Sequence, residues 1–340
     1  MKAAIFHGSG RPLTVEEVPT PTPGPGEILI RVAGCGVCHT DLHYLDHGTP
    51  TFKDPPLILG HEISGTVVEV GSGVETPQKG DRVLVAAVLS CGGCTACRTG
   101  RENICAHSTM IGNAVDGGYA EFVSVPARDV FSLPDEIPLV EGSIIADALT
   151  TPYHAVVNRG RVRPGDRVVV VGCGGIGLNV VQTAAALGAR VVAVDLNEAK
   201  LAWARRLGAE STVNPRDHDR PDRELRERTG GGAEVAFEVV GRPETQELAL
   251  GSVATGGRLV LVGYSPDTMS LNTGRVMFRE LEVVGSLGCR PVDYPRVIEL
   301  VRQGRLRVEE LVTHRFELEE VAAAFDTLRA GDAVRAVITP

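Results

Sequence analysis

The chain has 340 residues, 43% of them hydrophobic, and this length favours two domains with separate cores. Its net charge is −9, with acidic and basic residues mixed along the chain, which argues against nucleic acid or an anionic membrane as a partner. Residues 1–6 are too short and too soon interrupted for a secretion signal, so the eight cysteines indicate a cytoplasmic location, where clustered cysteines bind metal.

The first 90 residues are expected to form a compact, barrel-like β domain. Residues 19–26 are rich in proline and glycine and predict a loop, whereas Glu27–Val32 alternates between apolar and polar residues as a strand does. Residues 62–70 and 80–85 predict two further strands with a glycine turn between them.

Between these strands lies a polar stretch whose side chains suit a metal centre. It contains Cys38, His39, Thr40, Asp41 and His43, followed by His61 and Glu62. Cysteine sulfur and histidine nitrogen suit zinc, and a catalytic zinc takes three protein ligands and leaves one position open. Thr40 and His43 could then carry a proton away, while Asp41 could hold the ring of His61. The competing interpretation is a turn-rich loop with one buried cysteine and surface histidines.

Four cysteines follow at close spacing. Cys91, Cys94, Cys97 and Cys105 predict a closed, tetrahedral zinc site with a structural role and no room for a substrate. The alternatives are four unrelated buried thiols or two disulfides, and a reducing compartment disfavours the disulfides.

The next candidate ligand is a carboxylate in an apolar neighbourhood. After an expected strand at Tyr119–Val123, residues 142–154 look like the N-terminal half of a helix that carries Asp147.

A dinucleotide-binding pattern occupies the middle of the chain. Arg167–Val171 reads as a buried parallel strand, and Gly172, Gly174, Gly175, Ile176 and Gly177 lead into a helix that continues to Leu187. Glycines here permit close approach of a pyrophosphate to the helix N-terminus. Asp195 follows the next strand and would accept hydrogen bonds from ribose hydroxyls and repel a 2′-phosphate, which favours NAD over NADP. The alternative is a glycine-rich turn in some other α/β protein.

The remaining residues continue the alternation of strands and helices. Further strands are expected at Ser211–Val213, Val235–Val239, Arg258–Val262 and Glu282–Ser286, with helices at Asn197–Leu207, Pro221–Arg228 and Glu244–Leu250. Six alternating strands predict a doubly wound parallel sheet. Residues 292–340 show helical patterns and a last strand at Arg335–Ile338, and are expected to return to the first domain. The other cysteines and histidines, His47 among them, are expected to be core fillers or surface residues.

With these motifs in order, the chain resembles the zinc-dependent medium-chain alcohol dehydrogenases over essentially its whole length. The resemblance lies in residues 36–41, residues 60–62, the four clustered cysteines, and Gly172–Gly177 with Asp195. It implies an α/β fold in which a Rossmann doubly wound parallel sheet accompanies a mainly β GroES-like catalytic domain. The implied boundaries are 1–150 for the catalytic domain with its zinc lobe at 90–106, 151–287 for the NAD-binding domain, and 288–340 for the return.

The resemblance also implies roles for individual residues. Cys38 and His61 match the catalytic zinc ligands, and Glu62 matches a carboxylate that can transiently coordinate the metal. Thr40 and His43 match the proton relay, which includes the nicotinamide ribose. His39, Thr151 and Arg335 fall at positions expected to contact the cofactor. The family's usual third ligand is a cysteine, and Asp147 stands at that position here; the alternative is that Glu62 completes the site.

The implied activity is an NAD-dependent, zinc-dependent oxidoreductase that interconverts a primary or secondary alcohol and an aldehyde or ketone, with two zinc ions per chain. A polyol or sugar dehydrogenase is the alternative within the family, because related polyol enzymes use a carboxylate ligand. A zinc-free quinone or enoyl reductase is disfavoured by Cys38 and His61. The alternative from another class is a non-catalytic zinc and nucleotide-binding protein. Relatives form homodimers and homotetramers, so a homo-oligomer is expected.

Overall fold

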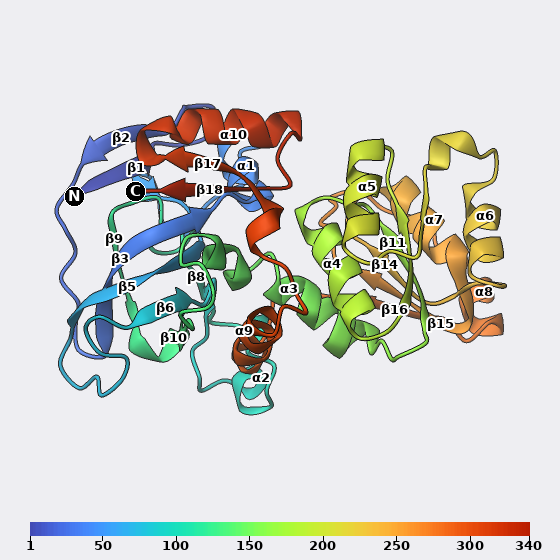
Figure 1. The fold of residues 1–340 in the computed structure, drawn as a ribbon, viewed down its shortest axis with the longest axis horizontal. Helices are drawn as coiled ribbons and strands as arrows, with labels where there is room; N and C mark the ends of the chain where they lie inside the picture. Colours follow the sequence, from blue (N-terminus) through green and yellow to red (C-terminus); the bar gives the residue numbers. More distant parts are fainter. The chain divides into compact units, whose positions relative to one another are not determined.

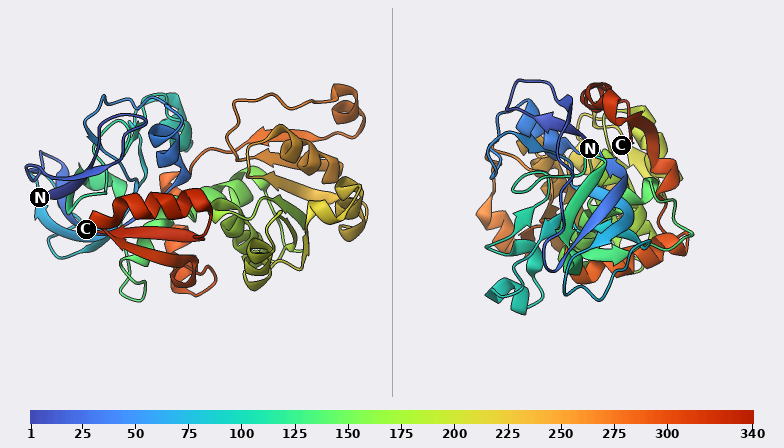
Figure 2. Two further views of the ribbon diagram at one scale, coloured as in Figure 1. Left: turned by 90° about the horizontal axis from the view of Figure 1, so that it is seen from above. Right: turned by 90° about the vertical axis from the view of Figure 1, so that its left-hand side faces the viewer.

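The computed structural model describes all residues, 1–340, and the chain divides into two compact units (Figure 1). Unit 1 comprises Met1–Thr150 together with Cys289–Pro340, and unit 2 comprises Thr151–Gly288. The chain therefore returns to unit 1 one residue later than expected. Both termini lie in unit 1, close to one another (Figures 1 and 2). No helix is both long enough and apolar enough to cross a membrane.

Unit 1 is built mainly from β-strands. Its main sheet has the order β10-β6-β5-β3-β18-β17, with β9 also pairing with β3; β2-β1-β4 form a second sheet, and β7 pairs with β8. The strands are β1 (Lys2–Phe6), β2 (Thr14–Glu17), β3 (Glu27–Gly36), β4 (Leu57–Ile58), β5 (Glu62–Val70), β6 (Arg82–Val85), β7 (Val88–Leu89), β8 (Thr109–Met110), β9 (Phe122–Pro126), β10 (Val130–Ser132), β17 (Val312–Glu317) and β18 (Arg335–Thr339).

Short helices connect these strands. They are α1 (His39–Leu45), α2 (Thr95–Arg98), α9 (Tyr294–Arg302) and α10 (Val321–Ala330), with 3-10 turns η1 (Glu102–Ile104), η2 (Ala127–Asp129), η3 (Glu141–Ala146), η6 (Pro291–Asp293), η7 (Glu309–Leu311) and η8 (Leu318–Glu320). The amphipathic helix α10 packs on β17 and β18 and buries Phe325 (Figure 2). Strand β17 had been expected to be helical, but it pairs in parallel with β18, and α10 supplies the crossover between them.

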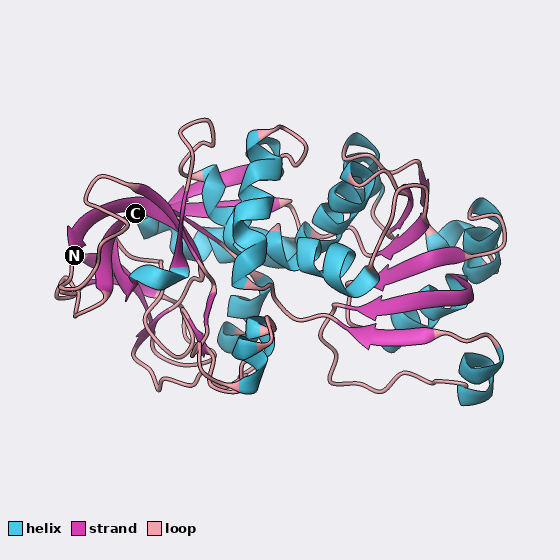
Figure 3. Cartoon of the chain, turned by 90° about the horizontal axis from the view of Figure 1, so that it is seen from below, coloured by secondary structure: helices cyan, strands magenta, loops and turns pink.

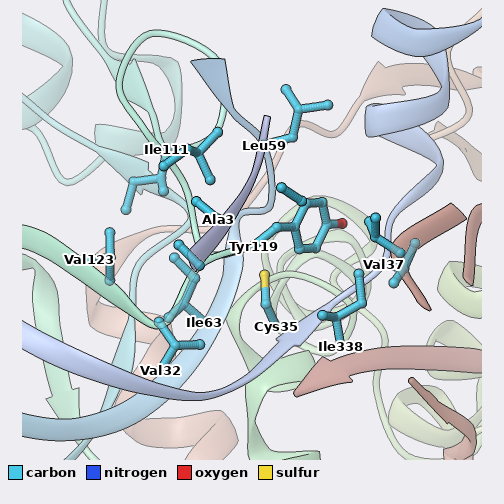
Figure 4. Packing of buried hydrophobic residues seen from close by; sticks show 14 of the residues in the cluster. Ala3, Val32, Cys35, Val37, Leu59, Ile63, Ile111, Tyr119, Val123 and Ile338 are labelled. Carbon is cyan, nitrogen blue, oxygen red and sulfur yellow. The ribbon is translucent and has the colours of Figure 1, made fainter. Parts of the chain in front are cut away.

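The core of unit 1 gathers the apolar faces of these strands. The ring of Tyr119 lies between Cys35, Leu59 and Val37 (Figure 4) and is fully buried. It meets Phe325 edge-on, with 5.9 Å between ring centroids. The expected strand at 119–123 begins only at Phe122, because the backbone of Tyr119 bonds to Ala4 and Leu59 instead.

Unit 2 confirms the predicted doubly wound sheet. Its six strands are all parallel and lie side by side in the order β13-β12-β11-β14-β15-β16 (Figure 3). They are β11 (Arg167–Val171), β12 (Arg190–Val194), β13 (Ser211–Val213), β14 (Ala233–Glu238), β15 (Val253–Leu261) and β16 (Glu282–Gly285). Val168–Val171 are nearly or fully buried, as a strand covered on both faces requires.

Helices cover both faces of this sheet (Figure 2). They are α4 (Gly175–Ala186), α5 (Glu198–Arg206), α6 (Pro221–Arg228), α7 (Pro243–Ser252) and α8 (Thr273–Phe278), together with the turn η5 (Pro215–Asp217). A short α3 (Thr150–Tyr153) and the π-helix η4 (His154–Gly160) lead into β11.

The expected helix across residues 142–154 was wrong. Residues 141–146 form the 3-10 turn η3, and Asp147 follows it with φ −136°, outside any helix. The carbonyl of Ala146 accepts hydrogen bonds from two side chains instead, the hydroxyls of Thr150 (2.9 Å) and of the distant Tyr294 (2.9 Å).

Candidate functional site

Four side chains that could hold a metal ion meet in unit 1, from three segments of the chain. They belong to Cys38, His61, Glu62 and Asp147, and their ligand atoms all lie within 4.8 Å of one another. Cys38 caps the start of α1, His61 and Glu62 stand at the start of β5, and Asp147 follows η3. The first three side chains are buried, and that of Asp147 is 22% exposed.

The cap of α1 orients Cys38. Its sulfur accepts a hydrogen bond from the backbone amide of Thr40 (3.5 Å), and the carboxylate of Asp41 accepts one from the amide of Cys38 (3.4 Å). The hydroxyl oxygen of Thr40 lies 3.5 Å from the same sulfur. The helix start therefore fixes the thiol and places a hydroxyl beside it.

A buried chain of polar groups stands behind His61. Oδ1 of Asp41 lies 3.8 Å from Nδ1 of His61, and the Tyr119 hydroxyl donates a 2.7 Å hydrogen bond to Oδ2 of Asp41. Burial raises the pKa of Asp41, while His61 and Tyr119 act to lower it. Asp41 thus faces the Nδ1 side of the ring, and the opposite nitrogen, Nε2, faces Asp147 in the cluster.

Glu62 is buried and paired with a residue from the far end of the chain. Its Oε2 accepts a hydrogen bond from the guanidinium of Arg335, and both side chains are at most 4% exposed. Strand β18 pairs with β3 and so brings Arg335 to this position. A side chain at Gly36, the partner of Glu62 in the β3–β5 register, would overlap this carboxylate, so the glycine is required. Arg335 had been expected to contact cofactor phosphates, which stays a prediction; its pairing with Glu62 was not foreseen.

This cluster fits a divalent metal ion. Nε2 of His61 and Oε1 of Glu62 are buried without a hydrogen-bond partner, which is costly unless something binds them. Nε2 of His61 lies 3.8 Å from Oδ2 of Asp147, near the roughly 3.3 Å edge that bond lengths of about 2 Å give in a tetrahedral zinc site. Burial lowers the pKa of His61, but Cys38 and Asp147 outweigh it and raise that pKa well above its ordinary value. The surroundings therefore favour a cation.

The four clustered cysteines also converge. The sulfur of Cys94 lies 3.5 Å from that of Cys97 and 3.7 Å from that of Cys105, and Cys91 lies 3.9 Å from Cys97 and 3.5 Å from Cys105. A tetrahedral zinc with bonds of about 2.3 Å has sulfur–sulfur edges of about 3.8 Å. Within residues 91–105 only Cys97 and Cys105 are buried, so this lobe has no apolar core of its own. The cluster suits a structural zinc.

Helix α1 carries Thr40 and His43, the expected proton-relay residues, and His39, which is expected to contact the cofactor. His39 is exposed at its start, and the half-buried His43 lies in its last turn, where Nδ1 is 3.1 Å from Nδ1 of His47. Burial, and then His47, lower the pKa of His43, so this ring is neutral near pH 7 and able to accept a proton.

In unit 2, the glycine loop joins β11 to α4. The helix begins at Gly175 with Gly174 as its cap, and a side chain at Gly177 would overlap the carbonyl oxygen of Gly172. Asp195 follows β12, and its two carboxylate oxygens accept hydrogen bonds from the amides of Cys173 (2.8 Å) and Asn197 (2.9 Å). The carboxylate thus braces the loop while keeping further lone pairs for a ligand.

Sequence reasoning missed three residues that support these sites. Tyr119 contacts Asp41, and Tyr294 contacts Ala146, across long sequence separations that no local sequence pattern marked. Glu238 ends β14 beside Val171, with Oε1 bonded to the amides of Val240 and Gly241 and Oε2 buried without a partner. The sequence feature that could have identified Glu238 is an acidic residue within the mostly apolar strand expected at Val235–Val239. Thr151, expected near the cofactor, is buried in α3.

Two family models cover most of the chain. One described as an alcohol dehydrogenase GroES-like domain matches residues 24–135, and one described as a zinc-binding dehydrogenase matches residues 175–303.

Curated proteins and solved structures match over nearly the whole length. An alcohol dehydrogenase of Geobacillus stearothermophilus is 36% identical over 332 residues (97% of each chain), and a sorbitol dehydrogenase of Bacillus subtilis is 33% identical over 331 residues (96% of this chain, 93% of the relative). A solved NAD-dependent alcohol dehydrogenase superposes with a TM-score of 0.94 at 31% identity, with 100% of both chains covered. A zinc-binding dehydrogenase of Sinorhizobium meliloti bound to NADP gives a TM-score of 0.91 at 32% identity, covering 100% of this chain and 99% of that one.

Proposed function

Because the chain belongs to the zinc-dependent medium-chain dehydrogenase family and is an oxidoreductase of its alcohol and polyol branch, we propose that it oxidises primary or secondary alcohols with NAD⁺ and reduces the corresponding aldehydes or ketones. The observation that carries this proposal is the convergence of Cys38, His61 and Asp147 beside the hydroxyl of Thr40. Two zinc ions per chain are part of the proposal, one in this cluster and one among the four cysteines.

Cys38, His61 and Asp147 would hold the catalytic zinc. Such an ion supplies a Lewis acid that stabilises negative charge on an alcohol or carbonyl oxygen, while NAD supplies the hydride acceptor. Asp147 is favoured over Glu62 as third ligand because Oε2 of Glu62 is already bonded to Arg335. Oε1 of Glu62 remains without a partner and is suited to transient coordination.

The protein's own groups would manage the proton and the substrate's orientation. The Thr40 hydroxyl, held at the start of α1, would accept the alcohol proton at the metal end, and His43 would receive it at the exposed end. To accept a proton, the imidazole of His43 must be neutral, and its lowered pKa favours the neutral form. His39 and Arg335 would contact the cofactor phosphates.

NAD is proposed over NADP on the strength of Asp195. A carboxylate that directly follows β12 repels a 2′-phosphate and accepts hydrogen bonds from ribose hydroxyls. Gly172–Gly177 and the N-terminus of α4 would bind the pyrophosphate. This assignment is tested by measuring kcat/KM with NAD⁺ and with NADP⁺, and we expect the value for NAD⁺ to be higher.

The decisive experiment is a panel of alcohols with NAD⁺, with zinc counted in the same sample. The proposal expects two zincs per chain and turnover of simple or benzylic alcohols. Cys38→Ser should abolish turnover while NADH still binds. Two zincs with no NAD-linked turnover on any alcohol would favour a non-catalytic role instead.

A polyol dehydrogenase is the second candidate. The carboxylate in the proposed ligand set and the similarity to a sorbitol dehydrogenase favour it. Rates on sorbitol or glucose compared with those on benzylic alcohols separate the two candidates.

The proposal includes a homo-oligomer. Strand β16 is an edge of the sheet in unit 2, and α8 beside it exposes Met277 (72%) and Phe278 (84%). An open strand edge with exposed apolar side chains suits a second copy of the chain. Light scattering of wild type and Phe278→Asp tests this, since the variant should shift towards monomer.

A further inference from the structure

A second imidazole lies beside the proposed proton acceptor of unit 1. Nδ1 of His43 and Nδ1 of His47 are 3.1 Å apart, and the ring centroids are 5.2 Å apart with planes tilted by 55°. Two ring nitrogens at this distance need one proton between them, because one must donate and the other accept. The contact therefore couples the protonation of one ring to that of the other.

The backbone holds His47 in this place. The amide of Thr49 donates to the carbonyl of His43 (3.0 Å), so the chain folds back over the end of α1. On the other side of His47, Asp46 accepts two hydrogen bonds of 2.8 Å from Arg329 of α10. His47 thus lies between two anchored residues, and its side chain is exposed to water.

The charged groups near the two rings are paired with one another. Asp46 is adjacent to His47 in the chain and pairs with Arg329 of α10, which also pairs with Asp326. Because the carboxylate is already paired with the guanidinium, it does not act as a bare anion that would trap a proton on the imidazoles. The exposed ring of His47 gives that proton access to water.

We propose that His47 is a second relay residue, which takes from His43 the proton released in alcohol oxidation and gives it to water. His43 accepts the proton on Nε2, its Nδ1 proton moves to Nδ1 of His47, and His47 releases its own Nε2 proton. One proton enters the pair and one leaves. The reverse sequence delivers a proton when a carbonyl is reduced, and exchange with water restores the starting tautomers. The inference rests on the proposed function, because the relay needs a reaction that releases a proton.

The first test needs no turnover. Histidine-labelled protein is titrated by NMR, following the ring nitrogens of His43 and His47 in wild type, His47→Gln and the control His218→Gln, a histidine of unit 2. The wild type should titrate in two coupled steps reported by both rings. In His47→Gln, His43 should titrate in a single step. Independent single steps in wild type would overturn the pair.

The second test measures proton release. At about pH 7, where His43 is neutral, the turnover of alcohol oxidation in His47→Ala should fall about tenfold and become dependent on buffer concentration. Added imidazole should restore the variant and leave wild type and His218→Gln unchanged, which a structural role for His47 would not produce. A variant with the wild-type pH profile and no rescue would overturn the relay. A wild type without turnover would instead refute the proposed function, and the NMR result would still decide whether the pair exists.

Discussion

Replacing Tyr119 by Phe would remove a single hydroxyl from the buried centre of unit 1. That hydroxyl donates to Oδ2 of Asp41 at 2.7 Å and also lies 3.2 Å from the carbonyl oxygen of Gly36. The phenyl ring would keep its contacts with Cys35 and Phe325, so the change isolates the hydrogen bond from the packing.

The size of the effect follows from what remains around Asp41. A hydrogen bond to a buried charged group contributes about 1.5–3 kcal/mol. Asp41 would keep the amide of Cys38, at 3.4 Å, as a weaker donor, so we expect the free energy of unfolding of zinc-free protein to fall by about 2 kcal/mol. Loss of a group that supports a metal-binding histidine costs about 10–100-fold in metal affinity. Because Asp41 itself stays beside His61, we expect about a tenfold loss of zinc affinity at this site.

Two measurements check these values. Urea unfolding of zinc-free Tyr119→Phe gives the stability change, and competition with a coloured zinc chelator gives the affinity. Tyr264→Phe, at a tyrosine that is 75% exposed in unit 2, is the matched control. If Tyr119→Phe matches this control in both assays, the Tyr119–Asp41–His61 chain does not support the metal site, and the reasoning fails.

Four further changes test the other sites. Asp147→Asn should strongly weaken binding of the catalytic zinc, measured by chelator competition, and Glu62→Gln much less; the opposite order would make Glu62 the third ligand. Cys94→Ser should remove one zinc per chain and expose residues 91–105 to protease, because that lobe has no apolar core; an intact, resistant lobe would refute its dependence on metal. Arg335→Met should cost about 3–5 kcal/mol in urea unfolding by leaving Glu62 unpaired, and a double change of both residues to Met should cost far less; equal losses would show that the pair is not coupled. Asp195→Ser should raise kcat/KM with NADP⁺ relative to NAD⁺, and an unchanged ratio would exclude its role in selecting the coenzyme.

The sequence was sufficient for features that depend on local pattern. The valines of β11, the glycines after it and the acidic residue that ends the next strand predicted the strand, loop and helix of unit 2, because residue periodicity and backbone freedom act over a few neighbours. The spacing of the cysteines predicted their convergence for the same reason, since a short lobe cannot separate them. Residue types alone also identified Cys38 and His61 as candidate metal ligands.

Only the tertiary structure decided which distant groups meet. Asp147 lies outside a helix because Tyr294, far along the chain, bonds to the carbonyl before it, and Glu62 is paired because β18 adds beside β3. Tyr119 reaches Asp41 through folded backbone that no periodicity records. Such contacts depend on how strands from opposite ends of the sequence are ordered in a sheet. The sequence therefore determined the chemistry that is available, and the folded chain determined which groups can use it together.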